Sequence, residues 1–274
     1  MLPHCRSLGA RRHRPRWLRL VLAGALALSA CGGPAADGSV PGTPGEGGGL
    51  SGSITVFAAS SLTEAYTALA DAFMDANPAA EVRLNLAGSA ELVAQIAAGA
   101  PVDVIATADA TSIAAAIDGL DVGSAAVPRP ARFATNELQI VVEAGNPRAV
   151  DGLGDLADPD LVVVLCDESV PCGRYAAQAL AIAGVAVNPA SREQSAKAVM
   201  SKVLLGEADA GIVYRTDVVA AGDDVAGIAL PDDVDVRVEY WMAARDGDVA
   251  AAFAAFVLGA TGQQILSSFG FGPP

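Results

Sequence analysis

Small polar residues stand at the start of four stretches that have the spacing of helices. Ser61, Ser89 and Cys172 lie in the turns before three of these stretches, and Ser195 lies at or near the start of the fourth. The first N–H groups of a helix lack partners in their own helix, and the helix start carries partial positive charge. Several such starts that converge can hold an anion without a lysine or an arginine. Serine is also a common structural N-cap, so a single position of this kind does not predict a site.

Other polar residues at strand ends allow two interpretations. Tyr214 ends a short apolar run, so its hydroxyl could face a ligand or its ring could fill the core. Asp103 and Asp109 could form a catalytic carboxylate pair, but both also fit strand-end and helix-cap roles. We favour the structural roles for the two aspartates, and for Tyr214 the residues alone leave both interpretations open.

Cys166 and Cys172 are the two cysteines in the body of the chain. In an oxidising exported compartment, an even number of cysteines favours a disulfide, here one that closes a short loop. Metal binding is the weaker interpretation, because two thiolates without a histidine leave a zinc site incomplete.

The first thirty residues have the composition of an export signal. Six arginines and no acid precede a short apolar run over residues 20–28, which is too short to span a bilayer. Small residues then lead to Cys31, an order that resembles a bacterial lipobox, in which Cys31 receives a lipid and becomes the new N-terminus. An ordinary signal peptide with an incidental Cys31 is the alternative.

Cleavage before Cys31 would change the charge and the chemistry of the chain. Six of the 17 basic residues and none of the 31 acidic ones precede Cys31, so 11 basic residues and a formal net charge of −20 would remain. Such an acidic chain is not expected to bind nucleic acid. His4 and His13 would also be removed, which excludes a Ser–His–Asp triad, a histidine-ligated metal and an imidazole proton switch. We therefore expect a binding protein and no enzyme.

Residues 31–52 are rich in Gly and Pro and are expected to form a flexible tether. From residue 53 onward, short apolar strands alternate with Ala-rich helical stretches. The expected strands cover residues 54–58, 82–87, 102–106, 138–142, 162–165, 211–214 and 234–242, and the expected helices residues 62–73, 89–98, 173–182, 195–205, 250–257 and 261–268, with a further helix after Asp109. Glu64, three residues after Ser61, could complete a capping box.

This alternation predicts an α/β fold with two lobes, each a mostly parallel sheet flanked by helices, and a ligand cleft between them. The chain is expected to cross between the lobes near residues 133–138 and 231–236. The first lobe would then contain residues 53–133 and 236–274, and the second lobe residues 134–235.

Five short motifs together resemble one known family. They are Thr55–Leu62, Ala87–Val104 with its Gly88-Ser89 start, Pro171–Tyr175, Gly211–Tyr214 and the ending Phe269–Phe271. Their order and spacing are similar to those of the molybdate-binding proteins that serve ABC importers, solute-binding proteins with a two-lobed fold. The similarity spans residues 53–272.

The resemblance implies which residues bind the ligand. The family uses two serine hydroxyls with their backbone amides, two further backbone amides and one tyrosine hydroxyl. By position these are Ser61 and Ser89 from the first lobe, with Cys172, Ser195 and Tyr214 from the second. Position 172 usually holds a small residue such as alanine and position 195 often an apolar one, but the backbone amide would do the binding at both.

The implied ligand is molybdate or tungstate, and no cofactor is expected. Both are fully deprotonated dianions near neutral pH, so every contact can be a donor. Phosphate keeps a proton that would lack an acceptor, and the smaller sulfate would reach fewer donors at good distance. Another oxyanion such as sulfate, an organic anion, or an exported enzyme without histidine are the alternatives; a sugar ligand would call for more aromatic residues. The expected protein is a monomer, held at the outer face of the cytoplasmic membrane by its lipid, that delivers its ligand to an ABC permease.

Overall fold

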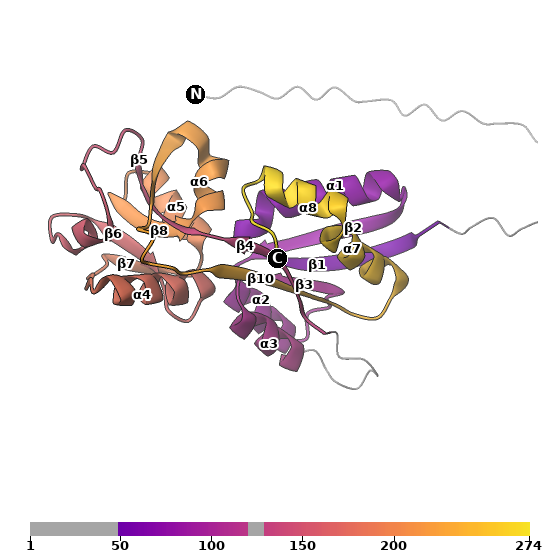
Figure 1. The fold of residues 1–274 in the computed structure, drawn as a ribbon. Coiled ribbons are helices and arrows are strands. Elements are labelled where there is room, and N and C mark those ends of the chain that lie inside the picture. The colour runs from indigo at the N-terminus through magenta and orange to yellow at the C-terminus, as the bar shows by residue number, and fades with distance from the viewer. Residues whose placement is uncertain (1–48, 120–128) are drawn as a thin grey trace, which may run out of the picture. The chain divides into compact units, whose positions relative to one another are not determined.

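The computed structural model describes residues 49–119 and 129–274, which contain two five-stranded sheets. The first sheet has the order β2-β1-β3-β10-β4 and the second the order β7-β6-β8-β5-β9 (Figure 1). The strands of the first sheet are β1 Ser51–Ala59, β2 Ala79–Ala87, β3 Val104–Thr107, β4 Ala131–Asn136 and β10 Val238–Ala244. Those of the second sheet are β5 Leu138–Glu143, β6 Val163–Cys166, β7 Ser191–Glu193, β8 Ala210–Tyr214 and β9 Val225–Ala229.

Helices cover both faces of each sheet. In Figure 1, α2 and α3 lie on the opposite face of the first sheet from α1, α7 and α8, and α4 lies on the opposite face of the second sheet from α5 and α6. The helices of the first lobe are α1 Thr63–Ala76, α2 Ser89–Ala97, α3 Ala110–Gly119, α7 Asp248–Leu258 and α8 Ala260–Ser268. Those of the second lobe are α4 Pro171–Ala183, α5 Ala196–Leu204 and α6 Arg215–Ala221. Three short 3-10 helices are η1 Ser60–Leu62, η2 Leu153–Ala157 and η3 Gly222–Asp224. The first lobe consists of the first sheet and its α-helices, and the second lobe consists of the second sheet and its α-helices.

Both sheets are mixed, whereas the alternation of strands and helices predicts mostly parallel ones. β1 pairs in parallel with β2 and β3, but β10 runs antiparallel to β3 and β4. The second sheet repeats this plan, with β6 parallel to β7 and β8, and β5 antiparallel to β8 and β9. β5 and β10 reach their sheets from the other lobe without a helix on the way, so no βαβ crossover imposes a parallel direction on them.

The run of apolar residues in β1 is explained by this double cover. Successive side chains of a strand point to opposite faces. Phe57 packs with Leu92 and Ile105 in the core under α2 and α3, while its neighbour Val56 belongs to the larger core on the α1 side. A strand buried on both faces needs a continuous apolar run rather than an alternating one.

The chain crosses between the sheets at two places. β4 ends at Asn136 and β5 begins at Leu138, and the chain returns between the end of β9 at Ala229 and the start of β10 at Val238. The strand expected from residue 234 therefore begins four residues later, because the Val234 amide donates to the Pro231 carbonyl in a turn. β4, β7, β9 and α6 are not among the predicted elements.

The structure tests only part of the two predictions for the N-terminal segment. The expected signal segment, Cys31 and residues 32–48 lie outside the described residues. β1 begins at Ser51, so the last two residues of the expected tether are strand residues, paired with β2. Within the described residues, no single helix has the length and apolar composition of a membrane span, and only α7 and α8 together, bent by 59°, reach it.

Candidate functional site

One pocket brings together all five residues that the sequence singles out. Ser61, Ser89, Cys172, Ser195 and Tyr214 line it, from both lobes. Its other lining residues are Ala59, Ser60, Gly88, Ala108, Val170, Pro171, Gln194 and Ala196. No residue in this lining carries a charge, so the pocket offers dipoles and hydroxyls to a ligand.

The pocket is small. Its cavity volume is about 10 Å³, which is close to the room that one water needs. Ser61, Ser89, Cys172 and Tyr214 are all buried, and Ser195 is half-buried. A pocket of this size has no room for a sugar or a peptide.

Three α-helices and one 3-10 helix start at the pocket. α2 begins at Ser89, α4 at Pro171 with Cys172 next, α5 at Ala196 after its N-cap Ser195, and η1 at Ser60. The amides of the first turn of an α-helix have no carbonyl partner in their own helix. Proline at the first position of α4 removes a donor that the helix does not use. The helix starts therefore direct amide donors and positive dipole ends towards one region.

Two serine hydroxyls of the pocket already accept one hydrogen bond each. The Ala108 amide donates to Ser89 Oγ at 3.2 Å, and the Ala198 amide donates to Ser195 Oγ at 3.2 Å. An amide N–H cannot accept, so in both contacts the serine oxygen is the acceptor. The hydroxyl protons of Ser89 and Ser195 remain free to donate to a ligand.

Ser61 has a different partner from the one expected. The capping box with Glu64 does not form, because η1 precedes α1 and the N-cap of α1 is Leu62, which has no side-chain hydrogen bond. Ser61 Oγ lies instead 2.9 Å from the Tyr240 hydroxyl, and the Glu64 carboxylate accepts from Lys197 Nζ at 2.7 Å.

Tyr214 ends β8 at the pocket with its side chain buried. Burial raises the pKa of its phenol well above the ordinary value, so the hydroxyl stays protonated at neutral pH. Among the described residues no hydrogen bond to this hydroxyl is formed. The Tyr214 amide donates to Asp217 Oδ2 at 3.3 Å, which helps to fix the turn from β8 into α6.

The expected disulfide is present. Cys166 and Cys172 are bonded, with their Cα atoms 5.7 Å apart. The bond ties the end of β6 to the first turn of α4, where the Cys172 amide lies. Disulfide sulfurs are not thiolate ligands, and the described residues contain no group of three or more His, Cys, Asp or Glu that could hold a metal ion.

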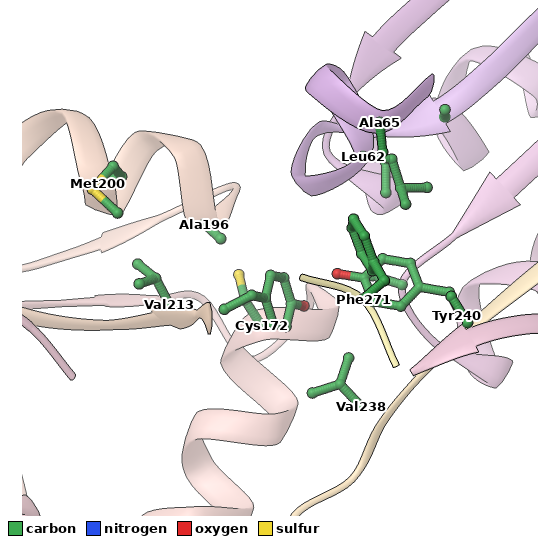
Figure 2. Packing of buried hydrophobic residues seen from close by; sticks show 14 of the residues in the cluster. Leu62, Ala65, Cys172, Ala196, Met200, Val213, Val238, Tyr240 and Phe271 are labelled. Carbon is green, nitrogen blue, oxygen red and sulfur yellow. The ribbon is translucent and has the colours of Figure 1, made fainter. Parts of the chain in front are cut away.

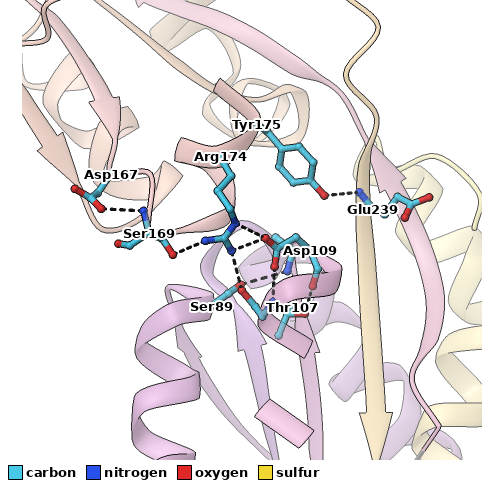
Figure 3. A network of polar contacts seen from close by, with 10 residues as sticks. Ser89, Thr107, Asp109, Asp167, Ser169, Arg174, Tyr175 and Glu239 are labelled. Atoms are coloured by element: carbon cyan, nitrogen blue, oxygen red, sulfur yellow. Dashed lines mark hydrogen bonds and ion pairs between the residues drawn. The ribbon is translucent and has the colours of Figure 1, made fainter. Parts of the chain in front are cut away.

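Two ion pairs join the lobes beside the pocket. Arg174 of α4 binds Asp109, the residue before α3, and also donates to Ser112 Oγ at 3.2 Å (Figure 3). Lys197 of α5 binds Glu64 of α1. Asp109 also accepts from the Ser112 amide at 2.7 Å as a helix cap, and Asp103 accepts from the Thr55 amide at 2.7 Å. Both aspartates thus have the structural roles that the sequence favours.

A close backbone approach accompanies these pairs. A Cβ at Gly88 of the first lobe would lie 2.7 Å from the carbonyl oxygen of Gln194 in the second lobe. That distance is shorter than van der Waals contact allows, so the lobes can meet this closely only because residue 88 is glycine. Gly88 has φ −59° and ψ 140°, which any residue can adopt.

Sequence reasoning missed several residues of the site. Gln194, Ala196 and Ala108 line the pocket, and Tyr240 lies behind Ser61. Tyr240 is in β10, 179 residues from Ser61. The sequence predicts the strand that contains Tyr240, but it does not predict on which face of the sheet the Tyr240 ring lies. Figure 2 shows Tyr240 packed with Phe271 near Leu62, and the two rings meet edge to face with centroids 5.3 Å apart.

Comparison with known proteins places this chain in a family. The model of the bacterial extracellular solute-binding proteins matches residues 54–272. The chain belongs to this family. A molybdate-binding protein (ModA) of Mycobacterium tuberculosis is 38% identical to this solute-binding protein over 251 residues, which are 90% of this chain and 93% of that protein. The family resemblance inferred from the five motifs is confirmed, and the chain is a transport-binding protein and not an enzyme.

Solved structures agree on the fold. The periplasmic molybdate-binding protein of Azotobacter vinelandii superposes with a TM-score of 0.68 at 21% identity, over 81% of this chain and 99% of that one. The sulfate-binding protein SubI of Mycobacterium tuberculosis gives 0.64 at 19% identity, over 81% and 86%. At such identities these structures show the fold alone, and they confirm the two-lobed α/β prediction.

Proposed function

We propose that this solute-binding protein captures molybdate, and also tungstate, outside the cytoplasm and delivers it to the permease of an ABC importer. The observation that carries the proposal is the uncharged pocket, in which hydroxyls and helix starts from both lobes meet. The similarity to a ModA protein over nine-tenths of the chain supports the choice of oxyanion.

The donor set is strong enough without a cation. The hydroxyls of Ser61, Ser89 and Tyr214, with the amides of Ser61, Ser89, Cys172 and either Ser195 or Ala196, make about seven donors to a dianion. Each such bond contributes about 1.5–3 kcal/mol, which gives roughly 10–20 kcal/mol before an association cost of about 4–15 kcal/mol. The difference between the hydrogen-bond gain and the association cost can therefore reach the binding free energy of a micromolar or tighter complex.

The polarity of the serines supports a fully deprotonated ligand. Ser89 and Ser195 each accept from a fixed amide, which occupies one lone pair of each oxygen and leaves the proton available to the pocket. A hydrogen phosphate ion would bring a proton for which the pocket lining offers no carboxylate acceptor, and an unmet donor in a buried site is costly. The pocket therefore favours molybdate and tungstate, and sulfate would be separated from them by size.

We further propose that the export signal and Cys31 attach this domain to the outer face of the membrane through a lipid, with residues 31–50 as a tether. The family is extracellular, which agrees with export. We also propose a monomer with the lobe bounds expected from the sequence. The bound, closed form would then be what the permease recognises.

Replacing Tyr214 with phenylalanine tests the proposed site. Tyr214→Phe removes one donor to a charged ligand and no hydrogen bond that the described residues form, so molybdate affinity should fall about ten- to two-hundredfold. The unfolding midpoint of the ligand-free protein should stay unchanged. Calorimetric titration of both proteins with molybdate measures the affinity, and equal affinities would show that Tyr214 does not bind the ligand.

A further inference from the structure

A buried polar chain lies behind Ser61. Asn136 Nδ2 is 2.8 Å from Thr216 Oγ1 and 3.4 Å from the Tyr240 hydroxyl, which is itself 2.9 Å from Ser61 Oγ. The four side chains come from β4, α6, β10 and η1, and all are buried. The chain therefore runs from the first crossing between the lobes to the edge of the pocket.

The direction of these hydrogen bonds follows from one backbone amide. The Glu137 amide donates to Asn136 Oδ1 at 2.9 Å, and an amide N–H can only donate. Asn136 Oδ1 is thereby identified as the oxygen, and Nδ2 must be the atom that faces Thr216 and Tyr240. Asn136 donates to both hydroxyls.

Tyr240 then has its proton left for Ser61. Its oxygen accepts from Asn136, and its nearest other polar neighbour is Ser61 Oγ. With Tyr240 as donor, Ser61 Oγ is the acceptor in this contact, and the Ser61 proton is free for the pocket. Ser61 thus acquires the same polarity that backbone amides give to Ser89 and Ser195.

The Tyr240 ring is held in place. Phe271 packs against it at 90° and 5.3 Å between centroids (Figure 2), and Phe133 and Tyr214 pack with their centroids 6.1 Å from that of Tyr240. The side chain is fully buried. Burial raises the pKa of its phenol, so the hydroxyl keeps the proton that it donates.

We propose that Tyr240, oriented by Asn136, is a positioning residue that keeps the Ser61 proton directed to the ligand and so favours oxyanions without a proton. The inference rests on the proposed function and names a specificity determinant of that same site. Without Tyr240, both lone pairs of Ser61 Oγ are free, and the hydroxyl can more readily turn to accept a hydrogen bond from hydrogen phosphate. Tyr240 acts through Ser61 and does not itself touch the ligand.

The test is a double-mutant cycle on the full chain, with molybdate and inorganic phosphate as the probes in calorimetric titrations. Tyr240→Phe should weaken molybdate binding about three- to tenfold, as the loss of one neutral hydrogen bond does. It should also raise the ratio of phosphate to molybdate affinity. In a Ser61→Ala background the same change should alter molybdate affinity by less than about twofold, because its effect passes through the Ser61 hydroxyl.

Tyr66→Phe is the matched control. Tyr66 is fully buried in the first lobe, and its hydroxyl has no hydrogen-bond partner among the described residues. Its loss should leave both affinities unchanged. If Tyr240→Phe does not fold, Asn136→Ala removes the hydrogen bond that orients the Tyr240 hydroxyl and keeps Tyr240 itself. Asn136→Ala should weaken molybdate binding less than Tyr240→Phe does, and it should have no effect on molybdate affinity in the Ser61→Ala background.

The outcomes separate the two proposals. A wild-type chain that binds no molybdate would overturn the proposed function and this inference with it. A wild-type chain that binds molybdate, with effects of Tyr240→Phe and Ser61→Ala that add or with an unchanged phosphate ratio, would overturn only the role of Tyr240. Non-additive effects with a raised phosphate ratio support it, because a merely structural role would not change selectivity.

Discussion

A hydroxyl can donate or accept, so the ligand that a serine binds depends on what its other neighbours have already taken. At this pocket the neighbours of Ser89 and Ser195 are backbone amides, which occupy one lone pair of each serine and leave its proton free. The sequence predicts which serines lie at helix starts, because N-cap preferences are local. It does not predict their polarity, since the deciding partners, such as Ala108 for Ser89, are set by tertiary packing.

Asp217 is a buried carboxylate three residues after Tyr214, the pocket residue that ends β8. Burial raises the pKa of this carboxyl to about 6 from its ordinary value near 3.8, and the charge of Lys197, 3.7 Å away, opposes part of the rise. Its Oδ1 has no hydrogen-bond partner in the described part of the chain. The ionised form is therefore costly in the folded protein.

The free energy of unfolding should depend on pH because of Asp217. Between pH 4 and pH 6 the folded state holds this proton while the unfolded state has lost it, so the free energy of unfolding falls as pH rises. One such group contributes at most about 1.4 kcal/mol per pH unit. In urea unfolding, the stability of the wild type relative to Asp217→Asn should fall from pH 4 to 6 and be level above pH 7. Exposed Asp223→Asn should give no such trend, and a flat difference for Asp217→Asn would show that the carboxyl is not buried as described.

At the scale of elements, the site depends on where strands end and helices begin. The expected helices after Ser61 and Ser89 form, and their starts meet at the pocket, because apolar spacing and cap residues are local signals. β4 escaped prediction because its sequence is mixed, and β9 because its short apolar run is interrupted by Gly227; the register of each strand comes only from pairing with β10 and β5. The antiparallel direction of β10 escaped it too, since the sequence predicts the crossing before this strand but not the direction in which the strand enters the sheet.

Closure should be blocked by one methyl group at Gly88. Gly88→Ala keeps an allowed backbone conformation, but its Cβ would meet the Gln194 carbonyl oxygen across the pocket at 2.7 Å. Each lobe should fold as before, while the lobes meet less closely and molybdate dissociates faster, by about five- to thirtyfold for a cost of about 1–2 kcal/mol. Stopped-flow dissociation measures this. Gly154→Ala, where an added Cβ has nothing within 4 Å, is the control; an unchanged rate in Gly88→Ala would mean that the lobes do not close through this contact.

At the scale of the whole molecule, the net negative charge of the chain opposes the binding of an anion. The chain has a formal net charge of −14 before any processing, so its long-range field repels an anion. Capture must then come from short-range donors that only both lobes together supply, with Arg174–Asp109 (Figure 3) and Lys197–Glu64 joining the lobes beside the pocket. Two lobes that close on a ligand form a hinge system, whose closed state a permease can recognise.

The most direct test of this account is a ligand panel on the wild-type protein at neutral pH. Thermal unfolding should be measured with molybdate, tungstate, sulfate and phosphate at equal concentrations, since a ligand that binds only the folded state raises its stability in proportion to the logarithm of concentration over Kd. Molybdate and tungstate should raise the Tm strongly, sulfate far less and phosphate barely. A response to phosphate equal to that to molybdate would contradict a pocket made of donors alone, and no response to any oxyanion from a folded protein would mean that these helix starts are caps and not a binding site.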